Sequence, residues 1–442
     1  MKLMKRISLP IVLFVASCAG DLLAQSAPDA QSDGNTISTT QTQSATDGTA
    51  DSTAPSSGQA ERVPEVAALD GSGSISMSLI RRPHLLIGGT VAGGYDSDPL
   101  NLGTGPSTAT YSFSPYIGLQ GGNLRTQMIV QYHPTISRFT SYAGQSMNLA
   151  SLKVASSFSP RFEWTLGIIG YHGDDSLRLL ESARSSPGDG VPGSGVGAAS
   201  FLPNAGTVTD VEGGLDLHYA LSERNSLGMR LSDSYNSTPD LHQKGSVATV
   251  YFNYTRSVSP TLSLLVYGQN AYYYGDLNCT ALGSGVGMRW QAQESTIIEA
   301  RGGPQIDSPG CKSQQGYAYN ASVTRKLPWK STVYLTADRQ PVISFLGSGL
   351  WQDDITAGYE RIFQNTNSLS INAGFIDSTT LVAASSYRGT FFDASYMRGI
   401  HRGLSLRCGY RIFTGRSGET DINRNTLQVA ITFTPNTRMS LQ

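Results

Sequence analysis

Charged and apolar residues are both scarce in this sequence. Only 15% of its 442 residues are charged and 39% are apolar, against about 25% and about 45–50% in ordinary globular domains. The net charge is −1, which removes the electrostatic reason to expect a nucleic acid as partner. No run of about 18 apolar residues occurs, so no transmembrane helix is encoded. A membrane-spanning β-barrel is not excluded, because its strands alternate between apolar and polar residues.

The first 24 residues have the pattern of a secretory signal peptide. Met1–Arg6 carries the basic residues, and 7–17 is a short, mostly apolar stretch. Two cleavage sites stay open. One follows Ala24, and the other precedes Cys18 in a lipobox-like sequence, which would make Cys18 a lipidation site and the protein a lipoprotein.

Residues 25–78 lack what a folded domain needs. They are rich in Ser, Thr, Gln, Asp and Gly, and no aromatic residue occurs between Phe14 and Tyr95. Such a stretch cannot bury enough apolar surface to offset the entropy lost on ordering. We therefore expect a disordered linker over 25–78 and one folded unit over 79–442.

In that unit apolar and polar residues alternate with a period of two, as in 211–219, 404–412 and 427–433. Alternation of this length predicts strands with one apolar and one polar face. The fold class expected is an all-β, antiparallel transmembrane barrel of about 18 strands, with 16 as the alternative. The expected spans are 84–96, 108–121, 124–140, 147–158, 162–173, 208–221, 226–236, 245–257, 261–275, 281–293, 295–305, 315–326, 331–343, 353–364, 368–377, 383–398, 403–414 and 424–435.

Between these spans, tight turns alternate with connections that are mostly longer. This alternation is typical of bacterial outer-membrane barrels, in which the tight turns lie in the periplasm. An even strand count then places both termini in the periplasm. Trp164, Trp290 and Trp329 fall at or beside the tight turns, and Trp351 falls near an outer loop. Aromatic rings favour both membrane interfaces, so we expect two girdles.

The first expected strand ends in Gly93-Gly94-Tyr95-Asp96-Ser97-Asp98-Pro99. This motif resembles the opening of porin-like outer-membrane β-barrel families of Gram-negative bacteria, some of which accompany exopolysaccharide secretion systems. The resemblance implies an outer-membrane barrel and, as partners, the barrel-assembly machinery and exopolysaccharide export components. One departure is the end of the chain. Such barrels usually finish on an aromatic residue, whereas here Phe433 is followed by further residues up to Gln442.

Two groups of residues are candidates for lining a pore. The longest connection, 174–207, is the third outer loop, which narrows the pore in general porins. Its candidate constriction residues are Asp174, Asp175, Arg178, Glu181 and Asp189. The inward faces of the expected strands carry charges of both signs: Arg125, Lys153, Asp210, Glu212, Asp216, Arg230, Arg289, Glu299, Arg301, Arg407 and Arg411. These charges suit either a wet channel or an interior plugged by salt bridges.

Cys279 and Cys311 lie in neighbouring outer loops, and a secreted protein reaches an oxidising compartment, so we expect a disulfide between them. Cys408 lies among apolar residues and is expected to act as a small hydrophobe. Gly188, Gly190 and Gly193 match a dinucleotide fingerprint, but without the strand and helix that it requires. The six histidines lack metal-ligand spacing. We expect no cofactor, no metal and no enzymatic activity.

Three functions stay open at this point. The first is a porin-like channel for passive passage of small solutes or for export of a polymer. The second is a non-conducting structural or adhesive barrel whose outer loops bind a partner. The third is a hydrolase built into the barrel wall. Outer-membrane lipid is a partner in each case, and a homo-oligomer is left open.

Overall fold

The structure is a computed structural model that describes residues 83–99, 103, 105–123, 125–174, 206–239, 243–275, 278–308, 315–343, 349–363, 367–380, 387–401, 403–417, 420–434 and 439–440. All of them belong to the unit 55–442. The expected signal peptide, Cys18 and the linker lie outside the described residues. Within the described residues no helix is long and apolar enough to cross a membrane.

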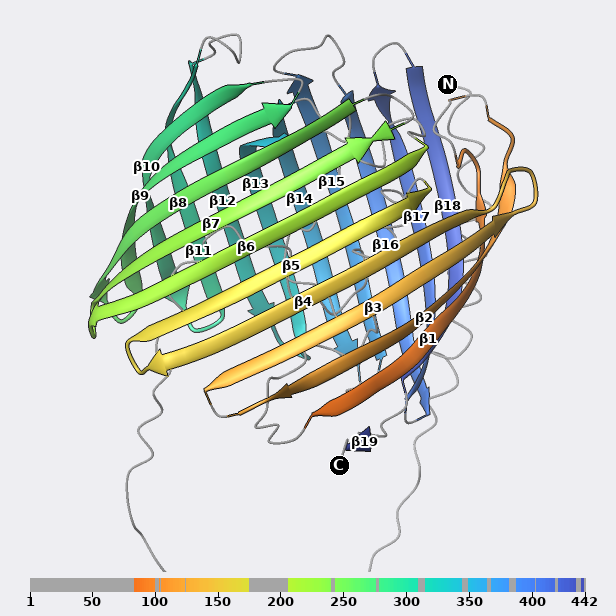
Figure 1. The fold of residues 1–442 in the computed structure, drawn as a ribbon, viewed down its shortest axis with the longest axis horizontal. Coiled ribbons are helices and arrows are strands. Elements are labelled where there is room, and N and C mark those ends of the chain that lie inside the picture. Colours follow the sequence, from red (N-terminus) through yellow and green to blue (C-terminus); the bar gives the residue numbers. More distant parts are fainter. Residues whose placement is uncertain are drawn as a thin grey trace, which may run out of the picture. The chain divides into compact units, whose positions relative to one another are not determined.

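Eighteen long strands and one two-residue strand form a single antiparallel sheet (Figure 1). They are β1 (His84–Asp96), β2 (Thr108–Gly122), β3 (Thr126–Phe139), β4 (Gln145–Ser159), β5 (Phe162–Asp174), β6 (Thr207–Ser222), β7 (Asn225–Thr238), β8 (Gln243–Ser259), β9 (Leu262–Gly275), β10 (Cys279–Gln293), β11 (Thr296–Asp307), β12 (Gln315–Leu327), β13 (Ser331–Ile343), β14 (Gly349–Phe363), β15 (Asn367–Thr380), β16 (Tyr387–His401), β17 (Leu404–Ser417), β18 (Thr420–Phe433) and β19 (Met439–Ser440). Each expected span overlaps one long strand.

The sheet closes on itself because β1 pairs with β18 over eight positions, from Gly89 opposite Phe433 to Asp96 opposite Thr426. Every other long strand pairs with its neighbours in sequence. The fold is therefore a porin-like barrel, which confirms the prediction of 18 strands and rules out the alternative of 16. Closure gives the backbone N–H and C=O groups of every strand a hydrogen-bond partner and leaves no open sheet edge.

The end of the chain extends the seam. Met439 and Ser440, in β19, pair with Leu85 and His84 of β1, beyond the point where β18 ends at Phe433. The residues after Phe433, which depart from the usual aromatic ending, thus include two that continue the pairing of the first strand.

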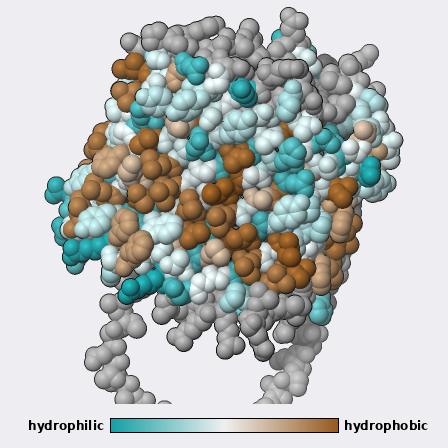
Figure 2. Space-filling model, viewed as in Figure 1, coloured by the Kyte–Doolittle hydropathy of each residue, from teal (hydrophilic) through white to brown (hydrophobic). Residues whose placement is uncertain are grey.

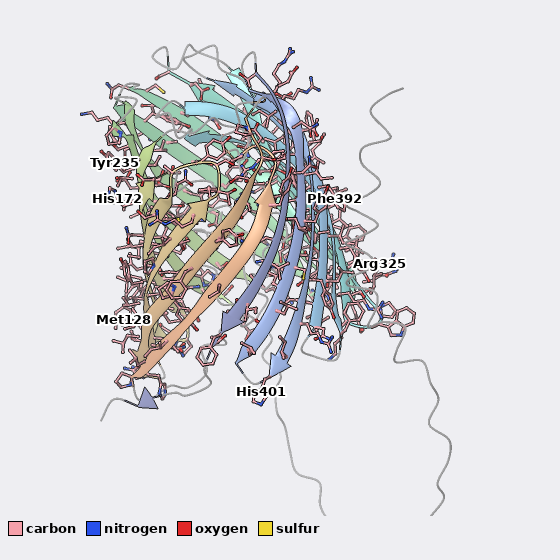
Figure 3. All side chains as sticks on the ribbon, turned by 90° about the vertical axis from the view of Figure 1, so that its right-hand side faces the viewer. Met128, His172, Tyr235, Arg325, Phe392 and His401 are labelled. Carbon is pink, nitrogen blue, oxygen red and sulfur yellow. The ribbon has the colours of Figure 1, made fainter. Side chains whose placement is uncertain are left out.

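Alternation along the strands gives the wall an apolar outer face. Figure 2 shows hydrophobic side chains gathered across the middle of the face in view. Large apolar side chains such as Val91, Phe113, Val286 and Ile431 are exposed on the outer face, and Figure 3 labels Met128 of β3 and Phe392 of β16, which occupy outward positions as well. A contiguous exposed apolar band of this kind is what a bilayer covers.

The tight turns lie at one end of the barrel and the longer connections at the other. The turn between β12 and β13 has two residues in the left-handed region, Trp329 at φ 59° and Lys330 at φ 55°. Two successive residues of this kind make the tight hairpin turn that follows the twist of the strands. Trp329 is also largely exposed, so its ring lies where a membrane interface is expected at the tight-turn end.

Candidate functional site

The candidate site is the inner face of the wall, because no side chain can reach a solute from the lipid side. Residues directly opposite each other in the ladder share a face, so the register assigns each charge to one side. The inward acidic residues are Asp96, Glu163, Asp210, Glu212, Asp216, Glu299, Asp307, Asp338, Asp354, Glu360 and Asp393. The inward basic residues are Lys153, Arg230, Arg289, Arg301, Lys326, Arg407, Arg411 and Arg424.

Ion pairs between neighbouring strands hold part of this charge. Arg411 Nε on β17 lies 2.8 Å from Asp393 Oδ2 on β16, and both side chains are nearly buried. Arg289 on β10 lies 3.3 Å from Glu299 on β11. Each of these pairs joins residues that face each other directly in the ladder. Such pairs fix the orientation of long side chains that would otherwise move freely in the lumen.

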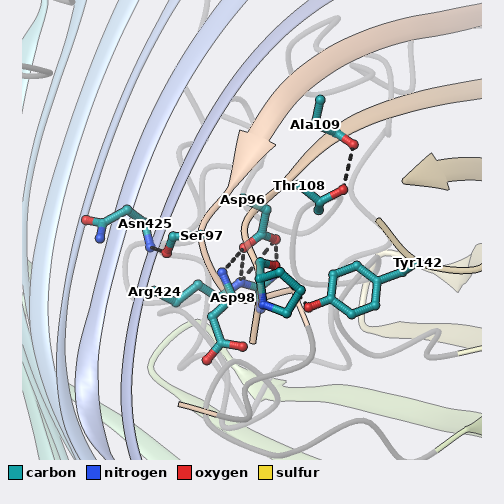
Figure 4. A network of polar contacts seen from close by, with 9 residues as sticks. Asp96, Ser97, Asp98, Thr108, Ala109, Tyr142, Arg424 and Asn425 are labelled. Atoms are coloured by element: carbon teal, nitrogen blue, oxygen red, sulfur yellow. Dashed lines mark hydrogen bonds and ion pairs between the residues drawn. The ribbon is translucent and has the colours of Figure 1, made fainter. Parts of the chain in front are cut away.

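A third inward pair ties the barrel seam at the end of the long connections (Figure 4). Arg424 on β18 donates two hydrogen bonds to the carboxylate of Asp96 on β1. Its Nη2 lies 2.6 Å from Oδ2 and its Nε lies 3.0 Å from Oδ1. The exposed fractions of the two side chains are 11% and 8%. Beside it, Ser97 donates its backbone N–H to Asn425 and accepts one through its hydroxyl. Asp96 belongs to the motif that carries the family resemblance, and its role in this barrel is closure.

A fourth inward cluster joins strands that are not neighbours. The guanidinium of Arg301 on β11 lies over the ring of Tyr251 on β8, 5.8 Å from its centroid, and its Nη1 is 3.5 Å from the phenol oxygen. Tyr251 in turn stacks on Tyr267 of β9 at 5.6 Å. β10 lies between them and leaves room, because a Cβ on Gly285 would stand 2.6 Å from the Tyr267 hydroxyl.

The wall folds inward around this cluster. β8 and β13 are not neighbours in the sheet, yet some of their Cα atoms lie within 8 Å of each other. The part of the wall formed by β8–β13, here called the β8–β13 lobe, is therefore strongly curved.

A second part of the inner wall is apolar and covered. Met147 and Leu149 on β4, Ile169 and Tyr171 on β5 and Val208 on β6 point inward near the end of the long connections. All five are almost completely buried. Within the described strands no group of His, Cys, Asp and Glu is arranged to hold a metal ion.

The structure places most of the sequence-predicted lumen residues on the inner face, and the register brings Asp216 opposite Arg230 and Arg289 opposite Glu299. Arg125 needs correction: it lies in the turn before β3, and its N–H is held by Asn123. The strand starts at Thr126 because the side-chain oxygen of Asn123 caps the turn. It accepts hydrogen bonds from the backbone N–H groups of Arg125 and Thr126.

Asp174 ends β5, is exposed and accepts a hydrogen bond from the Thr207 hydroxyl at 3.0 Å. Asp175, Arg178, Glu181 and Asp189 lie outside the described residues, as do Gly188, Gly190 and Gly193, so the predicted constriction stays a prediction. Cys279 is disulfide-bonded, but Cys311 lies outside the described residues and the pairing with it stays a prediction. Cys408 carries a thiol on the outer face of β17, level with Val429 of β18.

The sequence reasoning missed nine charged residues of the inner wall: Asp96, Glu163, Asp307, Lys326, Asp338, Asp354, Glu360, Asp393 and Arg424. Asp393 could have been found, since Phe391, Asp393 and Ser395 alternate with Phe392 and Ala394 inside an expected strand. Asp96 and Arg424 stood at the ends of their spans, where alternation no longer signals a face.

The chain matches no protein-family model and no curated protein. Among solved structures it is similar to OccK5 (OpdH) of Pseudomonas aeruginosa, with 12% identity and a TM-score of 0.44 over 80% of this chain and 99% of that one. It is also similar to OpdO of the same organism, with 11% identity and a TM-score of 0.46 over 80% and 98%. The siderophore receptor PirA of Acinetobacter baumannii gives 7% identity and a TM-score of 0.41 over 80% and 81%. Likenesses at this level say nothing about what this barrel binds or passes.

Proposed function

We propose that the barrel sits in the outer membrane of a Gram-negative bacterium, with its tight turns in the periplasm, and passes small polar solutes by diffusion. The observation that carries this proposal is a charged and hydroxylated inner wall inside an apolar outer band. Barrels of 16–18 strands have a circumference that leaves an aqueous channel. Gln428 on β18 supports an accessible lumen, because it points inward and is exposed.

The channel prefers cations. On the inner wall, acidic residues outnumber basic ones in the described strands, and several of the basic ones are held in the ion pairs above. A net negative lining raises the local concentration of cations and lowers that of anions.

The test is single-channel recording in planar bilayers with a potassium chloride gradient. We expect discrete conductance steps and a reversal potential of the sign that marks cation preference. Barrels that insert, migrate as heat-modifiable species on gels and give no conductance at any voltage would contradict a channel.

A second candidate is a closed barrel whose outer loops bind a partner. The observation that favours it is the covered apolar patch of Met147, Leu149 and Ile169, because an inner wall that meets water does not bury such residues. Absence of conductance in a folded barrel is the result that this candidate expects. Among the described strand residues no feature favours the hydrolase.

A further inference from the structure

Two arginines meet on the outer face of the barrel at the end of the long connections. Arg388 on β16 lies directly opposite Arg416 on β17 in the ladder. Both occupy positions that alternate with the inward residues Gly389 and Gly415, so they point away from the lumen. Their side chains are 70% and 65% exposed.

These arginines stand at the edge of the apolar band. Below Arg388, the outward positions of β16 are Thr390, Phe392, Ala394 and Tyr396, and Arg398 follows at the far end. The stretch 389–397 matches the ~9–11 residues with which a barrel strand crosses a bilayer. Arg388 and Arg398 therefore mark the two faces of the membrane on this strand, and Arg388 lies at the level of the outer headgroups.

The two guanidinium groups repel each other, although each also has a carboxylate neighbour. Like charges directly opposite each other destabilise an antiparallel pair of strands. The two acidic neighbours lie on the far sides of the pair: Asp377 on β15, 3.6 Å from Arg388 Nε, and Asp421 on β18, 2.9 Å from Arg416 Nε. Because both contacts use Nε, the Nη groups are the atoms that can reach an anion placed between β16 and β17.

The guanidinium of Arg388 is also held in place. It lies over the ring of Phe375 on β15, 5.1 Å from the ring centroid. Such stacking costs the guanidinium little of its hydrogen-bonding capacity, since all its N–H groups lie in the plane of the group. The donors are thus oriented before any ligand arrives.

We propose that Arg388 and Arg416 bind a phosphate group of an outer-leaflet lipid, a phosphorylated glycolipid whose acyl chains lie against the apolar band below. Guanidinium groups bind phosphate through paired, charge-assisted hydrogen bonds. A phosphate shared by the two would offset their mutual repulsion. A lipid is favoured over a free anion because Phe392 and Ile412, which face each other one outward position beyond Thr390 and Thr414, offer it an apolar surface below the charges.

The test uses the folded full-length barrel in detergent, incubated with lipid A and examined by native mass spectrometry. The variant is Arg388→Gln with Arg416→Gln, and the matched control is Arg398→Gln at the opposite face. We expect the double variant to bind lipid A at least about tenfold more weakly, a difference of about 1.4 kcal/mol, while the control binds as the unchanged protein does.

Two further arms identify the ligand. Dephosphorylated lipid A should bind the unchanged barrel as weakly as lipid A binds the double variant. Millimolar inorganic phosphate alone should fail to displace the lipid. Equal binding of lipid A to the folded double variant would overturn the proposal, and displacement by inorganic phosphate would show a free-anion site instead.

Discussion

Removing the charge of Asp96 tests the ion pair that closes the barrel. In Asp96→Asn the side chain keeps its size, but Arg424 loses its counter-charge while only 11% of its own side chain is exposed. Breaking a buried ion pair from one side destabilises proteins by about 3–5 kcal/mol. The backbone ladder of the seam stays intact, so we expect the lower end of that range.

The assay is unfolding of the detergent-folded barrel by guanidinium chloride, followed by tryptophan fluorescence. The control is Asp421→Asn, which breaks a pair with a single contact, 2.9 Å from Arg416 Nε, in which both side chains are mostly exposed. Exposed pairs contribute about 0–1 kcal/mol. Equal losses of stability in the two variants would refute the reasoning, because the seam pair is buried and makes two contacts whereas the control pair is exposed and makes one.

A double variant separates the ion pair from other roles of Asp96. Asp96→Asn with Arg424→Gln leaves no uncompensated charge at the seam, so it should recover part of the stability lost in Asp96→Asn alone. A double variant less stable than the single one would mean that the unpaired Arg424 is not the source of the loss.

Three further outcomes follow from the wall. Gly358→Val places a side chain where the Tyr334 ring now lies, 2.2 Å from an ideal Cβ, and chemical unfolding should show a loss of about 1–3 kcal/mol. Arg301→Ala removes the contact with Tyr251 inside the β8–β13 lobe, so single-channel conductance should rise; an unchanged conductance would place the solute path away from the lobe. Val429→Lys puts a charge on the lipid side and should reduce stability in bilayers by about 2–4 kcal/mol. The same charge at the inward, exposed neighbour, in Gln428→Lys, should change the stability little.

The sequence predicts all the long strands, but it predicts the contacts that close the barrel only in part. Alternation with a period of two identifies every long strand, and β1 and β13 have the expected boundaries, because each strand separates lipid from lumen along its whole length. Boundaries are less well predicted, and β16 starts at Tyr387, four residues later than expected.

Contacts between distant strands could not be predicted. Arg424 and Asp96 are 328 residues apart, and local alternation sets no register between the first strand and the last. The contact between Arg301 and Tyr251 depends on how sharply the wall bends over β8–β13. That bend leaves Tyr267 so close to Gly285 on β10 that a side chain there would clash with it. The residue pattern of a single strand does not reveal such a contact.

The closed seam between β1 and β18 is the central claim, and a cysteine pair tests it directly. The Thr90 and Thr432 hydroxyls lie 3.0 Å apart across the seam, so Thr90→Cys with Thr432→Cys should form a disulfide under mild oxidation. On a denaturing, non-reducing gel the cross-linked chain should migrate differently from either single variant, and a reductant should abolish the difference. A folded barrel in which both new thiols stay reactive and no cross-link forms would contradict closure of the first strand on the last.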